Sequence, residues 1–141
     1  MLTRDDLIAA LAAIRVSAPV RADEVTGSTN ATALAMAEDG APAWTLVAAG
    51  HQTDGRGRLG RTWTDVPGRA VLVSVVLRPA LPPARLGLLS LAAGAAVAEA
   101  IREQAGVDAE VKWPNDVRVG DRKVGGVLAE ASVADERIRH V

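Results

Sequence analysis

Residues 69–77 read Arg-Ala-Val-Leu-Val-Ser-Val-Val-Leu and carry the strongest strand signal in the chain. Valine is β-branched, and β-branched residues favour the extended backbone of a strand. Gly68 precedes the run and Pro79 follows it, so turn-forming residues bound it on both sides. We therefore expect a strand over residues 69–77.

The sequence before this strand alternates between helix and strand patterns. Thr3 followed by Asp6 predicts a helix start, with Leu7, Leu11 and Ile14 on one face of the helix.

Further elements follow this first helix. Residues 20–26 are consistent with a short strand, and residues 28–30 offer three N-cap candidates for an Ala-rich helix over residues 31–38. The apolar run 44–49 suits a buried strand. Residues 50–68 are polar and rich in Gly and Arg, so we expect a long loop there.

The clearest helix pattern follows Pro82 and Pro83 and ends at Gly106. Its apolar face is expected to consist of residues spaced by three and four: Leu86, Leu89, Ala93, Ala96 and Ala100.

The last third of the chain is rich in short strand patterns. Residues 110–113 predict a strand, residues 117–119 and 123–131 flank a turn as in a β-hairpin, and residues 136–141 resemble the beginning of another strand. Strands and helices that alternate and then end in a hairpin indicate an α/β (α+β) fold with a mixed β-sheet and flanking helices. On length, residues 1–141 form a single domain.

The chain has 141 residues, a formal net charge of −1 and no cysteine. A near-neutral charge gives no global field that attracts nucleic acid or an anionic membrane. The lack of cysteine excludes disulfides, thiolate metal sites and a thiol nucleophile. Asp5 and Asp6 do not suit a signal peptide, and we judge the apolar stretches too short and interrupted to span a bilayer. We therefore expect a soluble, cytoplasmic protein.

The segment Gly55-Arg56-Gly57-Arg58-Leu59-Gly60-Arg61 holds three guanidinium groups and three glycines. The glycines let the backbone approach a ligand closely, and the arginines can donate paired hydrogen bonds to phosphate or carboxylate oxygens. No Walker lysine follows, so the segment is not a P-loop. A flexible solvated loop and an RNA-binding segment are the alternatives, although repeated RGG units and interleaved aromatic residues are missing.

Lys112 ends an apolar strand in the segment Lys112-Trp113-Pro114-Asn115-Asp116. A lysine at such a position needs an anion beside its ammonium group if it is buried. The turn at residues 114–116 fixes the direction of the Lys112 side chain. A surface lysine beside a turn is the alternative.

Two more segments show distinctive patterns. Residues 28–30, Ser-Thr-Asn, are small hydrogen-bonding residues at a helix start, and helix capping alone explains them.

Residues 123–130 read Lys-Val-Gly-Gly-Val-Leu-Ala-Glu. Paired glycines inside a strand indicate either a close approach of another group to the backbone or a β-bulge.

Taken in chain order, the four segments resemble the biotin–protein ligases. The matching patterns are Ser28-Thr29-Asn30, Gln52-Thr53-x-Gly55-Arg56-Gly57-Arg58-x-Gly60-Arg61-x-Trp63, Lys112-Trp113-Pro114-Asn115-Asp116 and Lys123-x-x-Gly126-x-Leu128-x-Glu130. Each pattern is common by itself, but the ordered set is specific.

The resemblance implies a mixed-sheet fold shared with lipoate–protein ligases and a reaction in two steps. The biotin carboxylate attacks the α-phosphate of ATP, usually with Mg²⁺, and pyrophosphate leaves. The resulting biotinyl-adenylate then acylates a lysine of the biotin carboxyl carrier domain of a carboxylase. The implied enzyme is a biotin–[acetyl-CoA carboxylase] ligase, and the resemblance is compatible with a homodimer. From the composition and the short N-terminal segment we expect no DNA or membrane partner.

The same resemblance implies roles for individual residues. The expected catalytic residues are Lys112, Arg56 and Arg58. The residues expected to bind biotin are Ser28, Thr29, Asn30, Gln52, Arg56, Gly57, Arg58 and Lys112. The residues expected on the nucleotide side are Arg58, Arg61, Trp63, Asn115 and Lys123. Trp63 and Trp113 offer apolar walls, Asp116 is expected to orient Lys112 or Mg²⁺, and no metal ligand is otherwise assigned.

The chain departs from the family pattern at its ends. A full catalytic domain continues beyond Val141 with a further strand, more helices and usually a small barrel, so we expect this chain to hold the N-terminal part. The residues before Val20 are too few for a helix-turn-helix domain. The remaining alternatives are an inactive or partial fragment that only binds biotin, a relative that uses lipoate or octanoate, and an RNA-binding module.

Overall fold

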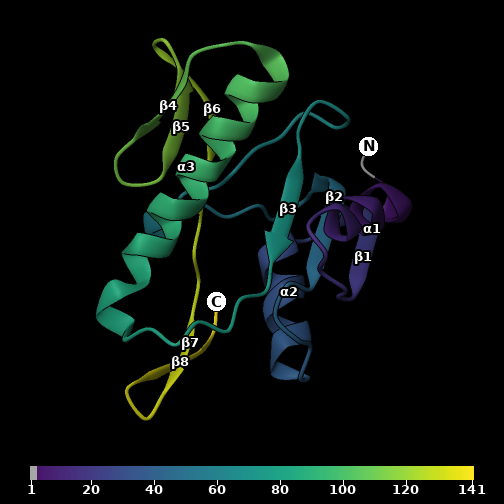
Figure 1. The fold of residues 1–141 in the computed structure, drawn as a ribbon, viewed down its shortest axis with the longest axis vertical. Coiled ribbons are helices and arrows are strands. Elements are labelled where there is room, and N and C mark those ends of the chain that lie inside the picture. Colours follow the sequence, from purple (N-terminus) through teal and green to yellow (C-terminus); the bar gives the residue numbers. More distant parts are fainter. Residues whose placement is uncertain (1–2) are drawn as a thin grey trace.

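The computed structural model describes residues 3–141 and shows α-helices and short strands in a mixed arrangement (Figure 1). In chain order the elements are α1 (Arg4–Ala13), β1 (Val20–Thr26), α2 (Thr29–Glu38), β2 (Leu46–Gln52), the 3₁₀ turn η1 (Arg58–Gly60), β3 (Leu72–Val75), the 3₁₀ turn η2 (Pro83–Arg85), α3 (Leu86–Ala105), β4 (Ala109–Lys112), β5 (Asp116–Val119), β6 (Arg122–Gly126), β7 (Ser132–Ala134) and β8 (Arg137–His140). The predicted α/β class is confirmed.

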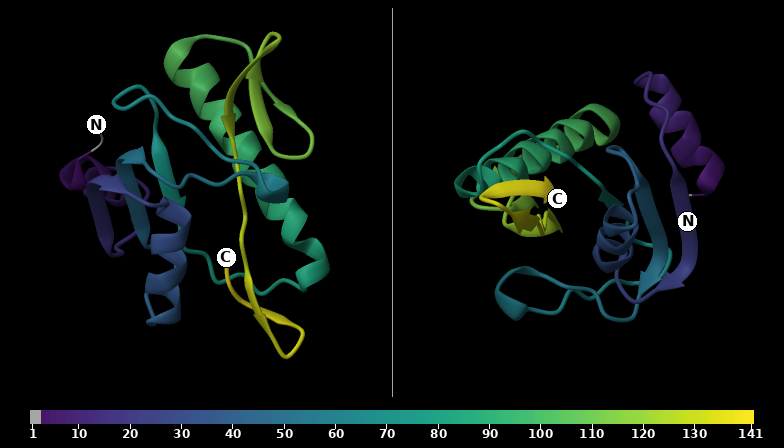
Figure 2. Two further views of the ribbon diagram at one scale, coloured as in Figure 1. Left: turned by 180° about the vertical axis from the view of Figure 1, so that it is seen from behind. Right: turned by 90° about the horizontal axis from the view of Figure 1, so that it is seen from below.

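The first sheet has the order β1-β2-β3 and is mixed, because β1 runs parallel to β2 while β3 runs antiparallel to it. Helices cover both faces of this sheet. Leu7 and Leu11 of α1 pack with Leu46 and Ala48 of β2, which point to one face. Val47 points to the other face and packs with residues of α2. Figure 2 shows the resulting three layers from below.

The second sheet has the order β4-β5-β6 and is antiparallel throughout. Helix α3 packs on it through the cluster of Ala98, Ala109 and Val117. Gly94 of α3 lies directly against Val111, so that a Cβ atom added at Gly94 would be 3.6 Å from a Val111 methyl carbon. The small residues of α3 thus let the helix lie close to the sheet.

A two-stranded hairpin, β7-β8, ends the chain. The residue after β8, Val141, exchanges two backbone hydrogen bonds of 2.8 and 2.9 Å with Leu77, which follows β3. The backbone at residues 127–131 runs from β6 to this hairpin and brings residues 128 and 130 toward α2. This crossing segment positions the candidate site (Figure 2).

Several predicted elements agree with the structure. Thr3 caps α1 in a reciprocal capping box with Asp6, Ser28 caps α2, and Gly106 ends α3. The predicted strand 20–26 coincides with β1. The hairpin around residues 120–122 is present, although its second arm ends at Gly126.

Other predicted positions are wrong. Ile14 is 60% exposed because α1 ends at Ala13 and the chain turns away there. The predicted strand 69–77 is shorter: β3 covers only Leu72–Val75, since only these residues pair with β2. The predicted strand 44–49 is shifted to Leu46–Gln52, because Trp44 has a positive φ of 71° and lies outside the pairing register.

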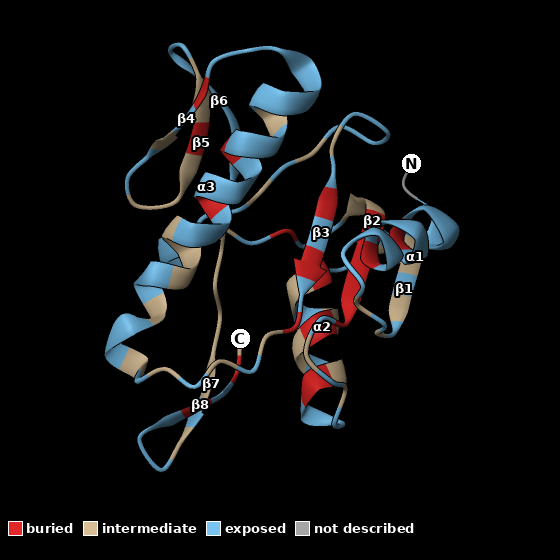
Figure 3. Ribbon diagram, viewed as in Figure 1, coloured by how far each residue is buried: buried red, intermediate tan, exposed pale blue. Residues whose placement is uncertain are grey.

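The predicted apolar face of α3 is also wrong. Ala93, Ala96 and Ala100 are exposed, whereas Gly94 and Ala98 are buried. The spacing of apolar residues predicts a helix. It does not predict which face of the helix is buried when alanine and glycine occur on every face. Figure 3 shows that α3 is mostly exposed, in contrast to β2, β3 and α2.

Residues Pro83–Ala105 form a helix that is long and apolar enough to cross a membrane by length and composition, with a mean hydropathy of 1.5 and 11% of the window buried. This corrects the expectation that every apolar stretch is too short. Alanine and glycine between the leucines keep the mean hydropathy high. A single helix of this kind is weak evidence for a membrane span, because core helices of soluble proteins have the same composition.

Candidate functional site

The segment between β2 and β3 holds the Arg-Gly loop, which we define as residues 53–64. It doubles back on itself: the Gly57 N–H donates to the Arg61 carbonyl at 2.7 Å, and the Trp63 N–H donates to the Gly55 carbonyl at 2.8 Å. Gly55 is required at this point, because a Cβ atom there would lie 2.5 Å from the Trp63 carbonyl oxygen. The backbone thus forms a narrow, hairpin-like loop, and Arg56 and Arg58 project from it.

A buried carboxylate fastens the two ends of the loop. The Asp65 side chain is fully buried, lies 2.9 Å from His51 Nδ1 and accepts a 3.2 Å hydrogen bond from the Gln52 backbone N–H. The hydrogen bond from His51 lowers the pKa of Asp65 below its ordinary value, with a smaller contribution from Gln52. The carboxylate therefore stays ionised and holds residues 51–52 against residue 65.

Beside the loop lies a polar network at the N-terminus of α2, formed by Thr29, Asn30, Gln52 and Ser74. The Thr29 backbone N–H and hydroxyl both reach Gln52 Oε1, at 2.7 and 3.0 Å. Ser74 Oγ lies 2.9 Å from Thr29 Oγ1 and hydrogen-bonds the side-chain carbonyl of Asn30. Side chains from α2, β2 and β3 therefore converge on one buried position.

Glu130 connects this network to the loop. Asn30 Nδ2 donates to Glu130 Oε2 at 2.9 Å and to the Leu128 carbonyl at 3.1 Å. The other carboxylate oxygen of Glu130 lies 3.3 Å from Arg56 Nη1. One carboxylate thus contacts both α2 and the Arg-Gly loop.

The second sheet contributes Lys123, whose ammonium group lies 2.7 Å from Asp116 Oδ1 and 5.4 Å from the centre of the Trp63 ring. The Trp63 ring also approaches Gly126: a Cβ atom there would be 3.3 Å from its Cζ3. The paired glycines therefore admit a close neighbour. Both glycines pair in register with β5, and the irregularity of the β5–β6 ladder lies beside them, between Val117 and Arg118.

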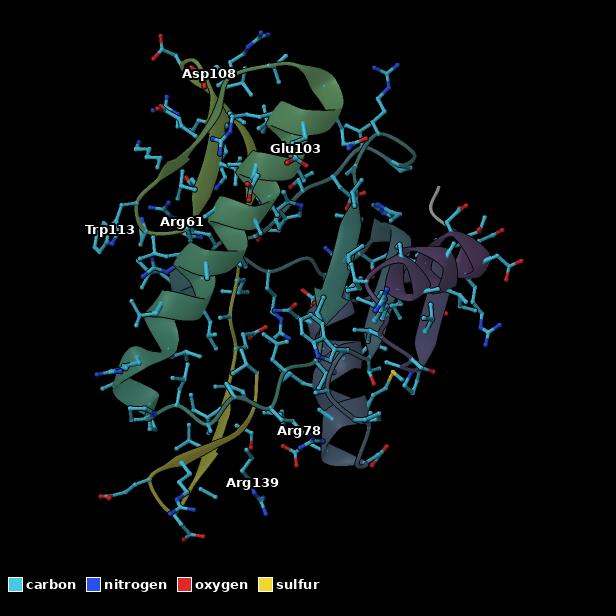
Figure 4. The ribbon with its side chains drawn as sticks, in the orientation of Figure 1. Arg61, Arg78, Glu103, Asp108, Trp113 and Arg139 are labelled. Atoms are coloured by element: carbon cyan, nitrogen blue, oxygen red, sulfur yellow. The ribbon has the colours of Figure 1, made fainter. Side chains whose placement is uncertain are left out.

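Arg58 reaches the turn between β4 and β5, where its Nη1 donates to Asn115 Oδ1 at 3.3 Å. Asn115 in turn donates to the Val127 carbonyl at 3.0 Å, which fixes its orientation. Lys112 pairs in register with Asp116, but its exposed side chain makes no hydrogen bond or ion pair with residues 3–141. Trp113 is 75% exposed and points away from the molecule (Figure 4).

An open cavity of about 610 Å³ lies along the Arg-Gly loop, lined by residues 54–62, Leu128 and Glu130. A smaller cavity of about 210 Å³ lies on the other side of Arg58, between Asn115 and the first turns of α3. Arg58 is the residue shared by both cavities. A guanidinium group at this position can contact anionic groups in either cavity.

The charges of the site are unevenly balanced. Arg56 and Lys123 are paired with Glu130 and Asp116. Arg58, Arg61 and Lys112 form no ion pair with any residue that the structure describes. Arg58 and Arg61 line the larger cavity together with the carboxylates of Asp54 and Glu130, whereas Lys112 lies outside both cavities. A carboxylate and a phosphate repel each other when they approach. Cationic side chains around them offset this repulsion and can hold the two anions side by side.

The structure brings most of the predicted site residues together. Thr29, Asn30 and Gln52 belong to one network, and Arg56, Gly57, Arg58 and Arg61 line the larger cavity. Ser28 serves as the cap of α2 and is buried. Lys112, Lys123, Trp63 and Trp113 line neither cavity.

The sequence interpretation missed Ser74, Glu130 and the pair of His51 and Asp65. Ser74 had a visible signal, because it is the polar residue of an apolar strand and sits at an inward position between Leu72 and Val76. Glu130 is the last residue of the pattern at residues 123–130, but that pattern offered no reason to assign it a role. The pairing of His51 with Asp65 depends on loop geometry and leaves no local pattern.

Comparisons with known proteins find relatives that are similar over most of this chain. Bifunctional ligase/repressor BirA of Bacillus subtilis is 41% identical over 118 residues, covering 84% of this chain and 36% of the relative. Biotin--[acetyl-CoA-carboxylase] ligase of Mycobacterium tuberculosis is 42% identical over 112 residues, covering 76% of this chain and 42% of the relative. The chain thus spans less than half of these curated relatives.

Solved structures show the same fold. The biotin protein ligase of Leishmania major in complex with biotin superposes with a TM-score of 0.66 at 29% identity, over 86% of this chain and 54% of that one. The biotin protein ligase of Aquifex aeolicus in complex with biotin and ATP gives a TM-score of 0.61 at 30% identity, over 86% of this chain and 50% of that one. The model of the biotin/lipoate A/B protein ligase family matches residues 23–141, which include every segment of the candidate site, and the chain belongs to this family.

Proposed function

We propose that the chain carries the biotin- and adenylate-binding part of an ATP-dependent biotin–protein ligase. In this proposal it forms biotinyl-5′-AMP from biotin and ATP and passes biotin to a lysine of a biotin carboxyl carrier domain. The observation that carries the proposal is that Arg56 and Arg58 line one open cavity, and that Glu130 in the wall of the same cavity links Arg56 to the polar network of α2.

The first half-reaction joins two anions, and the exposed cations suit it. Arg58 and Lys112 are assigned to the biotin carboxylate and the α-phosphate, where they would offset the charge that develops as pyrophosphate leaves. Arg61, Asn115, Lys123 and Trp63 are assigned to the nucleotide side. The exposed position of Lys112 requires that its side chain turn toward the ligands when they bind.

The polar network suits the other end of biotin. Ser28, Thr29, Asn30 and Gln52 offer donors and acceptors of fixed direction for a cyclic urea. The Arg-Gly loop, including Gly57, would then cover biotin and the adenylate, and a covered anhydride is shielded from hydrolysis.

Mg²⁺ enters the proposal with the triphosphate. Residues 3–141 contain no group of three or more His, Cys, Asp and Glu side chains arranged to hold a metal ion. Mg²⁺ in nucleotide enzymes usually binds through one or two carboxylates, substrate phosphates and water, so a single carboxylate such as Asp116 would be enough as a protein contact. The ion would supply charge neutralisation at the phosphates.

The assignment extends to the cellular context. The proposed partner is the biotin carboxyl carrier domain of a carboxylase in the cytoplasm, without DNA or membrane, and the homodimer is part of the proposal. The second candidate is a unit that binds biotin without forming the adenylate.

Biotin-dependent exchange of labelled pyrophosphate into ATP tests the activity. The chain with biotin, ATP and Mg²⁺ is expected to catalyse exchange, and omission of biotin is expected to abolish it. Biotin binding in calorimetry without exchange would favour the second candidate. Binding of lipoate in place of biotin would favour a lipoate ligase and contradict the proposal.

A further inference from the structure

Glu130 is the strongest unassigned feature of the site. Its carboxylate reaches Asn30 of α2 at 2.9 Å and Arg56 of the Arg-Gly loop at 3.3 Å, and it lines the larger cavity. Its side chain is 28% exposed, so it is accessible from the cavity yet fixed by two partners. No other carboxylate in the described part of the chain contacts both α2 and the loop.

The hydrogen bonds of Asn30 depend on this carboxylate. Asn30 Nδ2 faces Glu130 and the Leu128 carbonyl, and both are acceptors. Its carbonyl oxygen must therefore face Ser74. Glu130 thus sets which way the Asn30 amide points, and through Ser74 it is linked to Thr29.

The contact with Arg56 has a different consequence. A guanidinium group that is paired with an internal carboxylate is less available to the carboxylate or phosphate of a ligand. Because the Arg56–Glu130 pair is half-exposed and its closest distance is 3.3 Å, it is weak enough to be exchanged for a ligand anion.

We propose that Glu130 is a positioning residue that orients Asn30 and holds Arg56 in the empty protein, and that an anionic ligand competes with it for Arg56. This inference rests on the proposed biotin site for the identity of the ligand. The contact itself is a property of the protein without ligand, so the two claims can be tested separately.

Trypsin tests the contact without any ligand. Glu130→Gln keeps an acceptor for Asn30 but removes the charge that holds Arg56. We expect cleavage after Arg56, Arg58 or Arg61 to become about two- to fivefold faster, the range expected for loss of an exposed ion pair. Glu103→Gln removes one charge from the exposed face of α3 and serves as the matched control, with the wild-type rate (Figure 4). Equal loop cleavage in all three proteins would overturn the holding role.

Calorimetry with biotin and biotinamide tests the competition. Glu130→Gln is expected to bind biotin about two- to fivefold more tightly and to bind biotinamide, which has no carboxylate, as the wild type does. Glu130→Ala, which also removes the acceptor for Asn30, is expected to bind biotinamide more weakly than the wild type and biotin more weakly than Glu130→Gln does. Equal effects of Glu130→Gln on biotin and biotinamide would overturn the competition, and unchanged binding of both by Glu130→Ala would overturn the orientation of Asn30. Absence of biotin binding by the wild type would instead contradict the proposed function and leave the cleavage result standing.

Discussion

Asp65 shows how a single side chain can fix a long loop. It closes the segment that begins at His51 and Gln52 by contacting both, and its side chain is fully buried. The contacts are short and involve an ionised group, so they are worth more than an exposed surface pair.

Asp65→Asn should therefore destabilise the protein by about 1 to 2 kcal/mol at neutral pH. The folded-state pKa of Asp65 is lowered by His51, so the stabilisation is present above the ordinary pKa of about 4 and is lost as pH falls through the lowered value. Urea unfolding of both proteins between pH 7 and pH 3 measures this. A stability difference that grows on acidification would contradict the assignment.

Gly55→Ala should open the Arg-Gly loop, because the added Cβ would lie 2.5 Å from the Trp63 carbonyl oxygen. We expect a loss of about 1 to 3 kcal/mol in the free energy of unfolding, together with faster proteolysis of residues 56–61. Gly87→Ala is the control, since nothing lies within 4 Å of its added Cβ. If both variants unfolded alike, the loop hairpin would not depend on Gly55.

Arg58→Ala addresses the proposed chemistry at the same scale. Arg58 is exposed and lies between the two cavities, and its one side-chain hydrogen bond to a residue that the structure describes goes to Asn115. Pyrophosphate exchange should fall by about 100-fold, the effect of removing one preorganised donor, with stability nearly unchanged. Arg69→Ala removes an exposed guanidinium outside the site, and an equal loss of exchange in that variant would contradict the role of Arg58.

At the scale of elements, Arg78 joins the end of α2 to the last strand. Its guanidinium group donates to the carbonyls of Ala37 and Ala41 and to that of Arg139 in β8, at distances between 2.7 and 3.3 Å (Figure 4). Arg78 thereby adds a charged donor to a carbonyl in the last turn of α2, to one in the loop after it and to one in β8.

Arg78→Ala should therefore lower the free energy of unfolding by about 1 to 3 kcal/mol, because several carbonyls lose a charged donor. Arg78→Lys should recover only part of this, since one ammonium group cannot reach all three carbonyls. Chemical denaturation of the three proteins measures the order. Full recovery by lysine would show that charge alone, rather than the shape of the guanidinium group, accounts for the contact.

The elements also show what a sequence can predict. Caps and turn residues located α1, β1 and the end of α3, because local hydrogen bonds determine them. The extent of β3 and the buried face of α3 were predicted wrongly, because pairing with β2 and packing against Val111 are tertiary effects. The composition of the sequence predicted the Arg-Gly loop. The contacts of Asp65 with His51 and Gln52 could not be predicted, because they form only when the chain folds.

At the scale of the whole molecule, the hydrophobic core of residues 3–141 includes three clusters: two on the faces of the first sheet and one beneath α3. The candidate site lies where the Arg-Gly loop and the segment from β6 to β7 pass between these parts (Figures 1 and 2). Its residues therefore come from α2, β2, β3, the Arg-Gly loop, the strands β4 to β6 and the crossing segment, so the four sequence motifs that match the family lie far apart along the chain.

Detection of the adenylate by mass spectrometry tests the central claim most directly. The chain incubated with biotin, ATP and Mg²⁺ is predicted to yield biotinyl-5′-AMP, with none formed when lipoate replaces biotin and much less formed by Arg58→Ala. A folded protein, verified by circular dichroism, that forms no biotinyl-5′-AMP, or that forms an adenylate of lipoate instead, would contradict the account.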